Sequence, residues 1–114
     1  IGAENNTYKQ LSSQWSCDLN ITISGMHWLD FAPHDVNKGL ALKRIQSVLG
    51  ISPEETLVFG DYFNDVPMMK AAYYSYAMQN APDGVKKEAR FCAPTNNEAG
   101  VLKVISDLEA KGLI

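Results

Sequence analysis

Apolar and polar positions alternate in two short runs near the start of the chain. Residues 19–24 switch between apolar and polar side chains at every step, which is typical of a half-buried strand. A Ser24-Gly25 turn signal precedes a second extended run at residues 28–31, so the pattern predicts an antiparallel pair. Residues 5–14 are polar with weak helical spacing, and Pro33 ends the second run.

From Lys38 onward the spacing changes to a helical rhythm. Gly50 stands where the C-terminal cap of this first helix is expected. The apolar positions of the helix are Leu42, Ile45, Val48 and Leu49. Residues 52–55 have the spacing of a capping box with proline at the first helical position, which predicts one short turn of helix.

The rest of the chain predicts strands that alternate with helices. Strands are expected at residues 56–59, 74–78 and 90–92, and helices at 66–72, 82–89 and 97–111. This alternation at close spacing is typical of parallel βα units. The pattern therefore predicts an α/β fold.

Composition limits the classes of partner. The chain has 114 residues and 46% hydrophobic content, enough for a packed core in a unit of single-domain size. Ten basic residues stand against 13 acidic ones and no basic block occurs, so we expect neither nucleic-acid nor membrane-surface binding. No apolar stretch approaches the roughly 20 residues that span a bilayer. Two distant cysteines suggest no disulfide framework, and we expect a cytoplasmic location.

The most informative segment is residues 57–69. An apolar run ends at Gly60-Asp61, and an Asn64-Asp65 pair then opens a second apolar run with helical spacing. This layout places polar side chains at the carboxyl end of a strand, where open α/β sheets bind ligands. Beside a glycine that permits a tight turn, the Asp61 carboxylate could reach a Mg²⁺ ion. Alternatively, Gly-Asp is only a turn and Asp61 caps the next helix.

Asn64, Asp65 and Lys38 are the other candidates for this chemistry. An amide can donate to a phosphoryl oxygen, and a carboxylate can orient a metal-bound water or a lysine. One residue of the Asn64-Asp65 pair is equally explained as a helix N-cap. Lys38 opens a helix after the N-cap candidate Asn37, where a cation is unfavourable unless an anion is also bound. The alternative for Lys38 is a solvated surface lysine.

Three other positions are not expected to take part in the phosphate chemistry itself. Asp30 alternates with apolar neighbours, so we expect it on the solvent side of its strand. Tyr62 and Phe63 are bulky for a loop beside a metal, and we expect one of them to face the substrate entrance.

Four motifs together resemble a known family. They are Asn37-Lys38-Gly39, Gly60-Asp61-x-x-Asn64-Asp65-x-x-Met68, Ala77-Met78-x-Asn80-Ala81 and Asn96-Asn97-Glu98-x-Gly100-Val101. In order and spacing they resemble the carboxyl-terminal half of haloacid dehalogenase (HAD) superfamily phosphatases. The closest resemblance is to the Cof-like subgroup with a C2-type α/β cap, and it runs from about residue 28 to the end. It implies a cap end at residues 1–32 and half of a three-layer Rossmann-like core at 33–114.

The resemblance also implies a reaction and its participants. In such enzymes an aspartate attacks a phosphoryl group and forms an aspartyl-phosphate, with Mg²⁺ bridging the nucleophile and the phosphate. Asp61 and Asp65 would then serve the metal, while Lys38 and Asn64 would contact the phosphate. The expected substrate is a small phosphorylated metabolite such as a sugar phosphate. A phosphotransferase or phosphomutase on the same fold, or a non-catalytic α/β scaffold, remains an alternative.

The chain departs from the family pattern at the amino-terminal motifs. No Asp-x-Asp nucleophile motif occurs in the sequence, and the Thr or Ser motif that precedes the cap is also absent. With Ile1 rather than Met at the start, this indicates a piece of a longer protein that lacks the amino-terminal half of the core. We expect the fragment to be inactive alone and to self-associate through an exposed sheet edge and apolar face.

Overall fold

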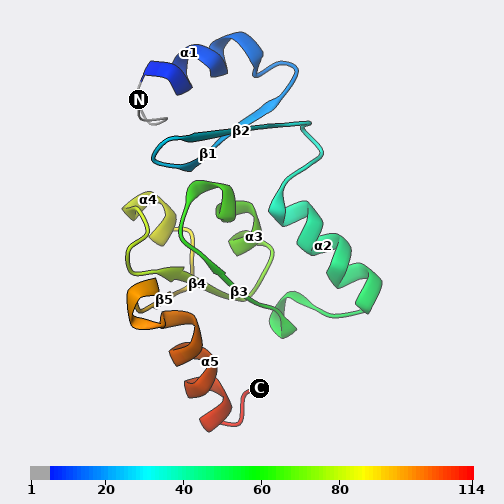
Figure 1. Ribbon diagram of the computed structural model, residues 1–114. Coiled ribbons are helices and arrows are strands. Elements are labelled where there is room, and N and C mark those ends of the chain that lie inside the picture. Colours follow the sequence, from blue (N-terminus) through cyan, green and yellow to red (C-terminus); the bar gives the residue numbers. More distant parts are fainter. Residues whose placement is uncertain (1–5) are drawn as a thin grey trace.

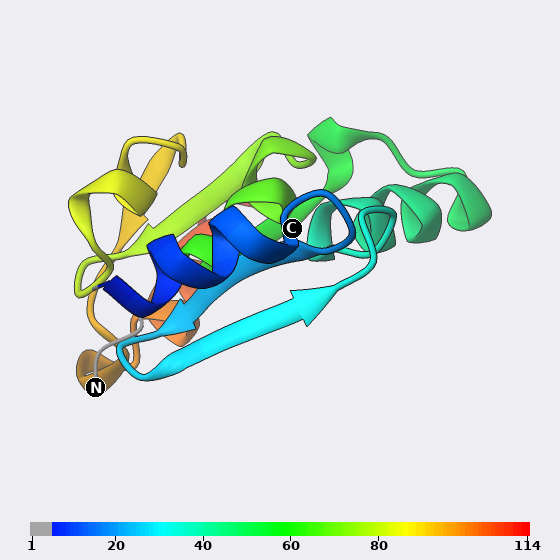
Figure 2. The ribbon, with the colours of Figure 1, turned by 90° about the horizontal axis from the view of Figure 1, so that it is seen from above.

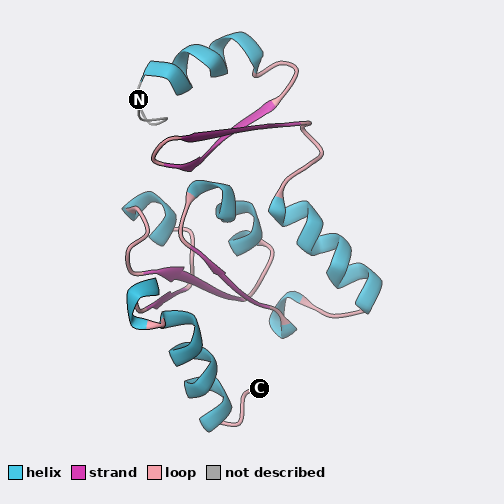
Figure 3. Cartoon of the chain, viewed as in Figure 1, coloured by secondary structure: helices cyan, strands magenta, loops and turns pink. Residues whose placement is uncertain are grey.

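The computed structural model describes residues 6–114, which form a mixed α/β fold with two separate sheets (Figures 1 and 3). Helix α1 (Asn6–Trp15) precedes an antiparallel hairpin of β1 (Asn20–Gly25) and β2 (Trp28–Ala32). The second sheet is parallel, in the order β3 (Leu57–Gly60), β4 (Tyr74–Met78) and β5 (Phe91–Ala93). The predicted antiparallel pair and parallel units are both confirmed.

The helices follow the predicted order with different lengths. They are α2 (Lys38–Leu49), α3 (Val66–Lys70), α4 (Asp83–Lys86) and α5 (Gly100–Ala110), with 3₁₀ turns η1 (Pro53–Glu55), η2 (Phe63–Asp65) and η3 (Asn96–Glu98). The predicted helices at 66–72 and 82–89 are too long, because the chain tightens into i+3 turns after Lys70 and Lys86. Along residues 6–114, no helix has the length and apolar character needed to cross a membrane.

The single helix predicted at residues 97–111 is also wrong. Ala99 adopts a left-handed conformation with φ 55° and separates η3 from α5. This turn brings Gly100 against the Pro94 carbonyl oxygen, which leaves no room for a β-carbon. The break is therefore a close backbone contact that helical periodicity does not reveal.

Helices cover both faces of the parallel sheet. One face is packed against α3 and α4 and the other against α5 (Figure 1). The buried residues of the first face are Met69, Ala77, Ala81 and Val85, and those of the second are Met78, Ala93, Val104 and Leu108. The hairpin lies beyond α3 and α4, and α1 lies across the hairpin when seen from above (Figure 2).

The later two motifs hold together the loops at the carboxyl edge of this sheet. Asn80 follows β4, and its side-chain oxygen accepts the backbone N–H of Asn96, which follows β5, at 3.3 Å. In the capping box of η3, the Thr95 hydroxyl donates to Glu98 at 2.6 Å. This hydrogen bond, together with one from the Thr95 backbone N–H, lowers the pKa of Glu98. Both motifs therefore stabilise the loops after β4 and β5, and β4 is the neighbour of the strand that precedes Asp61.

Helix α2 has the caps that the sequence predicts. Asn37 accepts the backbone N–H of Leu40 at 2.9 Å, and Gly50 ends the helix with φ 67°. The buried residues of α2 are Gly39 and Gln46, whereas the apolar stripe is largely exposed. Within the described residues, most of that stripe therefore has no apolar surface to pack against.

Candidate active site

Asp61 lies directly after β3, at the carboxyl edge of the parallel sheet. Its side chain is exposed, and η2 turns the chain back so that Asp65 lies behind it. A β-carbon on Gly60 would stand 2.5 Å from the Asp65 β-carbon, and Gly60 has no positive φ. Glycine is therefore required here by the close approach of Asp65 and not by a left-handed backbone conformation.

Asp65 organises the loop from a buried position. One carboxylate oxygen accepts the backbone N–H groups of Asp61 at 3.0 Å and Tyr62 at 3.2 Å. The other oxygen forms an ion pair with Lys38 Nζ, and the Asp65 side chain is only 7% exposed. Both oxygens of this carboxylate thus bind groups of the chain itself. They fix the backbone on which the Asp61 side chain stands.

Lys38 reaches this point from the first turn of α2. Its side chain is 51% exposed, so the ammonium group has access to solvent as well as to Asp65. Gly39 lies against the backbone of Pro67, where any β-carbon would overlap the Pro67 carbonyl group. Gly39 therefore permits the close contact between α2 and Pro67, and this contact places the neighbouring Lys38 beside Asp65. Asp65 supplies an anion near the positive end of the helix.

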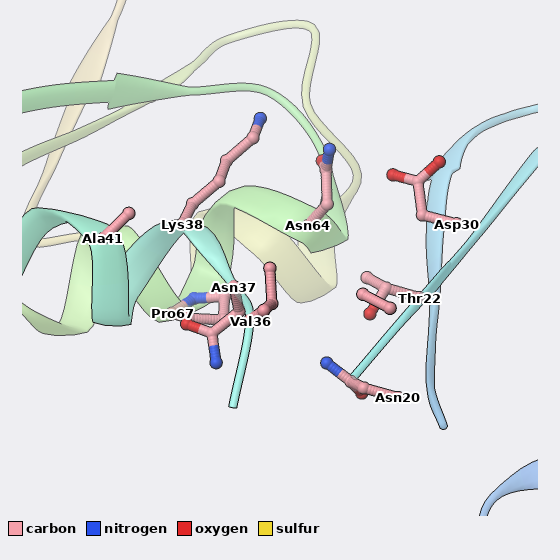
Figure 4. Close-up of a pocket in the computed structure, with 10 residues that line it drawn as sticks. Asn20, Thr22, Asp30, Val36, Asn37, Lys38, Ala41, Asn64 and Pro67 are labelled. Atoms are coloured by element: carbon pink, nitrogen blue, oxygen red, sulfur yellow. The ribbon is translucent and has the colours of Figure 1, made fainter. Parts of the chain in front are cut away.

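Asn64 lies beside Lys38 on the wall of a cavity of about 340 Å³ (Figure 4). Asn64 is half-buried, and its side chain forms no hydrogen bond with any residue of the described range 6–114. The structure therefore brings Lys38, which is distant in sequence, to Asp61, Asn64 and Asp65 at one edge of the sheet. The cavity between core and hairpin could accommodate a small ligand next to them.

The opposite wall of this cavity comes from the hairpin, which the sequence did not single out. Asn20, Thr22 and Asp30 line it, although Asp30 was expected on the solvent side of its strand. That expectation is incomplete, because the exposed Asp30 faces a cavity whose other wall is the core. Strand alternation correctly placed these residues on a polar face. It could not reveal that this face lies opposite Lys38 and Asn64.

Tyr62 and Phe63 occupy the bend between Asp61 and Asn64. Their rings meet edge to face with centroids 5.6 Å apart. Phe63 also packs over Gly84 of α4, where a β-carbon would stand 3.1 Å from the ring. It shares a second cavity with Tyr8 and Ile21, so it lies between the core and the α1–hairpin layer. A role at the substrate entrance stays a prediction.

The residues fit a metal ion that takes only part of its coordination from this chain. Among residues 6–114, no group of three or more His, Cys, Asp or Glu residues is placed to hold a metal. Asp61 offers one exposed carboxylate at the strand end. Mg²⁺ is typically bound through one or two carboxylates together with phosphate oxygens and waters. Asp61 is therefore suitable as one ligand of a shared site.

Comparisons with known proteins show which family the chain belongs to. A family model described as haloacid dehalogenase-like hydrolase matches residues 2–105. The chain is 37% identical over 89 residues to the 5-amino-6-(5-phospho-D-ribitylamino)uracil phosphatase YbjI of Escherichia coli (strain K12), covering 77% of the chain and 33% of that protein. It is 34% identical to the phosphatase YwtE of Bacillus subtilis (strain 168), which carries the same enzyme name, covering 76% of the chain and 30% of the relative.

Solved structures give the same result. SMU.1108c from Streptococcus mutans UA159 matches with a TM-score of 0.86 and 36% identity, covering 95% of this chain and 41% of that one. The sugar phosphatase BT4131 matches with a TM-score of 0.82 and 26% identity over 100% of this chain and 42% of that one. The chain thus spans about a third of the length of these curated relatives. The resemblance to Cof-like HAD phosphatases is confirmed, and the chain belongs to the haloacid dehalogenase-like hydrolase family.

Proposed function

We propose that this chain supplies the carboxyl-terminal half of the active site of a Mg²⁺-dependent phosphomonoesterase that acts on small phosphorylated metabolites. The observation that carries the proposal is the hydrogen-bonded arrangement of Asp65 with Lys38 and with the backbone of Asp61. It brings together a lysine on α2 and a carboxylate after β3 that a turn or a helix cap alone would not require. A phosphoryl group and a divalent cation are the ligands that suit this pair.

Each of the four residues has a distinct proposed role. Lys38 balances negative charge on the phosphoryl oxygens, and Asn64 donates its amide N–H to the same group. Asp61 is the carboxylate ligand of Mg²⁺, which when bound polarises the phosphoryl group. Asp65 serves the metal site indirectly, by holding the Asp61 backbone and orienting the Lys38 ammonium group. The proposed substrate class agrees with the relatives' names, which specify a phosphorylated ribityl compound and a sugar phosphatase.

The nucleophile in this proposal comes from a segment that is not in the sequence, because no Asp-x-Asp motif occurs there. Among the described strands β3 has only β4 as a neighbour, so its other edge is open for pairing. A parallel strand added at that edge would bring its own carboxyl end beside Asp61. We propose that an amino-terminal half of the core occupies this edge and that residues 1–32 are the end of a cap domain.

The shape of the chain supports a missing partner. The radius of gyration is 15.6 Å, and the chain extends over 49 × 33 × 17 Å. A compact domain of this length has a radius of gyration of about 13 Å. A flat, extended fold with an open sheet edge is the form expected of one part of a larger core. Self-association of the isolated chain through the same surfaces follows from this proposal.

The test uses this chain joined to an amino-terminal segment that carries the Asp-x-Asp motif. We expect Mg²⁺-dependent hydrolysis of p-nitrophenyl phosphate by the joined protein and none by the 114-residue chain alone. Asp61→Ala should lower kcat/KM at least about 100-fold, a loss typical of disturbed metal sites. Lys38→Ala should lower it by about 100- to 1,000-fold, as removal of a group that stabilises transition-state charge does.

Matched controls separate catalysis from folding. Lys43→Ala, on the same helix, and Asp107→Ala, on α5, remove exposed charges and should leave turnover within about twofold. Full activity of Asp61→Ala would refute the metal assignment. Absence of Mg²⁺-dependent hydrolysis by the joined protein would favour the scaffold alternative. Transfer of the phosphoryl group to an added sugar in preference to water would identify a phosphotransferase instead.

A further inference from the structure

Phe63 lies in the loop between the proposed metal ligand and the proposed phosphate ligand. Asp61 stands two positions before it, and Asn64 follows it directly. Asp65 holds the start of this loop through the backbone N–H groups of Asp61 and Tyr62. Asn64 has no comparable support, because its side chain forms no hydrogen bond with any residue in the range 6–114. Its position is therefore set by the backbone of the turn η2.

The Phe63 ring rests on helix α4 at a glycine. A β-carbon on Gly84 would stand 3.1 Å from ring atom Cε1 and 3.5 Å from Cζ, so the ring lies directly over the helix backbone. Figure 1 shows α4 beside the turn between β3 and α3. The next residue of α4, Val85, is 0% exposed and packs in the core with Met69, Ala77 and Ala81. Helix α4 therefore offers η2 a firmly placed surface.

The other neighbours of the ring hold it less firmly. Tyr62 meets it edge to face with centroids 5.6 Å apart, but Tyr62 belongs to the same loop. On the hairpin side, Phe63 borders a cavity of about 360 Å³ together with Tyr8, Ile21 and Ile23. That cavity leaves space between the ring and the hairpin. Of these three contacts, only the one with Gly84 ties the middle of η2 closely to another element of the core.

We propose that Phe63 is a positioning residue that holds η2 on α4 and thereby sets the position of the Asn64 amide. This inference rests on the proposed phosphatase function, in which Asn64 binds the phosphoryl group. It adds a contact outside the reacting groups on which their geometry depends. A misplacement of 1 Å in an active site can lower the rate on the order of 100-fold, so a small change at Gly84 should affect turnover through Phe63.

Gly84→Ala in the joined protein tests the inference from the α4 side. The added methyl group requires the Phe63 ring to shift by a few tenths of an ångström, and kcat/KM for p-nitrophenyl phosphate should fall about threefold. Alanine favours a helix more than glycine does, so the midpoint of chemical denaturation should not fall. Lys87→Ala, at the exposed C-cap of the same helix, is the control and should leave both quantities unchanged.

Double variants show whether the effect passes through Phe63 and Asn64. Phe63→Leu keeps an apolar side chain but lacks the Cε1 and Cζ atoms that meet Gly84, and it should lower kcat/KM about tenfold. In the Phe63→Leu background, Gly84→Ala should change kcat/KM by less than about 1.5-fold, because the ring is absent. In the Asn64→Ala background, Phe63→Leu should cost less than about twofold, because the group that it positions is gone.

Two results would contradict the positioning role and leave the proposed function intact. One is full activity of Gly84→Ala and Phe63→Leu while Asn64→Ala is impaired. The other is an equal loss from Phe63→Leu with and without Asn64, since the ring would then act on stability or on another group. Absence of Mg²⁺-dependent hydrolysis by the parent joined protein would instead refute the function itself.

Nuclear magnetic resonance on the 114-residue chain gives a test that needs no activity. Gly84→Ala should shift the side-chain amide signals of Asn64, and Lys87→Ala should not. The shift caused by Gly84→Ala should disappear in the Phe63→Leu background. Unchanged Asn64 signals in Gly84→Ala, or the same shift with and without the Phe63 ring, would overturn the inference.

Discussion

The two sides of helix α2 reverse the usual relation between polarity and burial. On its inner side a glycine and a glutamine are buried, whereas on its outer side Ile45, Val48 and Leu49 are 52%, 72% and 65% exposed. The buried Gln46 is fully accommodated, because its amide donates to the Thr56 hydroxyl at 2.9 Å and to the Ala71 carbonyl at 3.0 Å. The outer side has no comparable partner among residues 6–114.

This difference is consistent with the proposal that a missing half of the core covers the outer side. The inner side makes defined contacts within the chain, since Gly39 permits contact with Pro67 and this contact places Lys38 against Asp65. The outer side has the apolar pattern of a surface that becomes buried in a larger core. Variants on the two sides should therefore differ in what they disturb.

The largest effect on stability is expected from Gly39→Val. Its side chain would overlap the Pro67 backbone and force α2 away from α3, so the free energy of unfolding should fall by about 3 kcal/mol. Chemical denaturation of the 114-residue chain measures this loss. Ser47→Val adds the same side chain at an exposed position of α2 and should cost far less. Equal losses in the two variants would mean that the close contact is unimportant.

A smaller loss is expected from Gln46→Ala. The substitution leaves the Ala71 carbonyl without its side-chain donor and should lower the free energy of unfolding by about 2 kcal/mol. Lys43→Ala, on the exposed part of the helix, is the matched control in the same denaturation experiment. If Gln46→Ala and the control lowered the free energy of unfolding equally, the buried amide would contribute little to stability.

The smallest effect on the chain's own stability is expected from Val48→Glu combined with Leu49→Glu. Both positions are exposed, so the free energy of unfolding should change by no more than about 0.5 kcal/mol per site. The same double variant should weaken self-association of the chain, as measured by sedimentation velocity, and weaken capture of an amino-terminal half. Unaltered association would show that the outer side is not the docking surface.

Much of the fold was predictable because its signals are local. Strand alternation identified β1 and β2, and the cap residues Asn37 and Gly50 marked both ends of α2. Helix lengths were less predictable. Ala99 interrupts a continuous helical pattern because Gly100 must approach Pro94, and that contact is set by tertiary structure.

The candidate site shows the same division. Residue types and spacing singled out Lys38, Asp61, Asn64 and Asp65, each with a structural alternative, and the family resemblance then favoured the phosphate site. They did not reveal that Asp65 binds both Lys38 and the Asp61 backbone. Nor did they reveal the hairpin wall, since alternation distinguishes two faces of a strand without saying what lies opposite each face.

The sequence by itself therefore determined the order of elements, indicated the family and singled out four candidate site residues, all of which depend on short-range spacing. Tertiary structure alone decided why Gly39 and Gly60 must be glycines, which side of α2 is buried, and which hairpin residues face the cavity. The physical reason is that these properties depend on distances between segments far apart in the chain. Such distances are set by packing, which local periodicity does not specify.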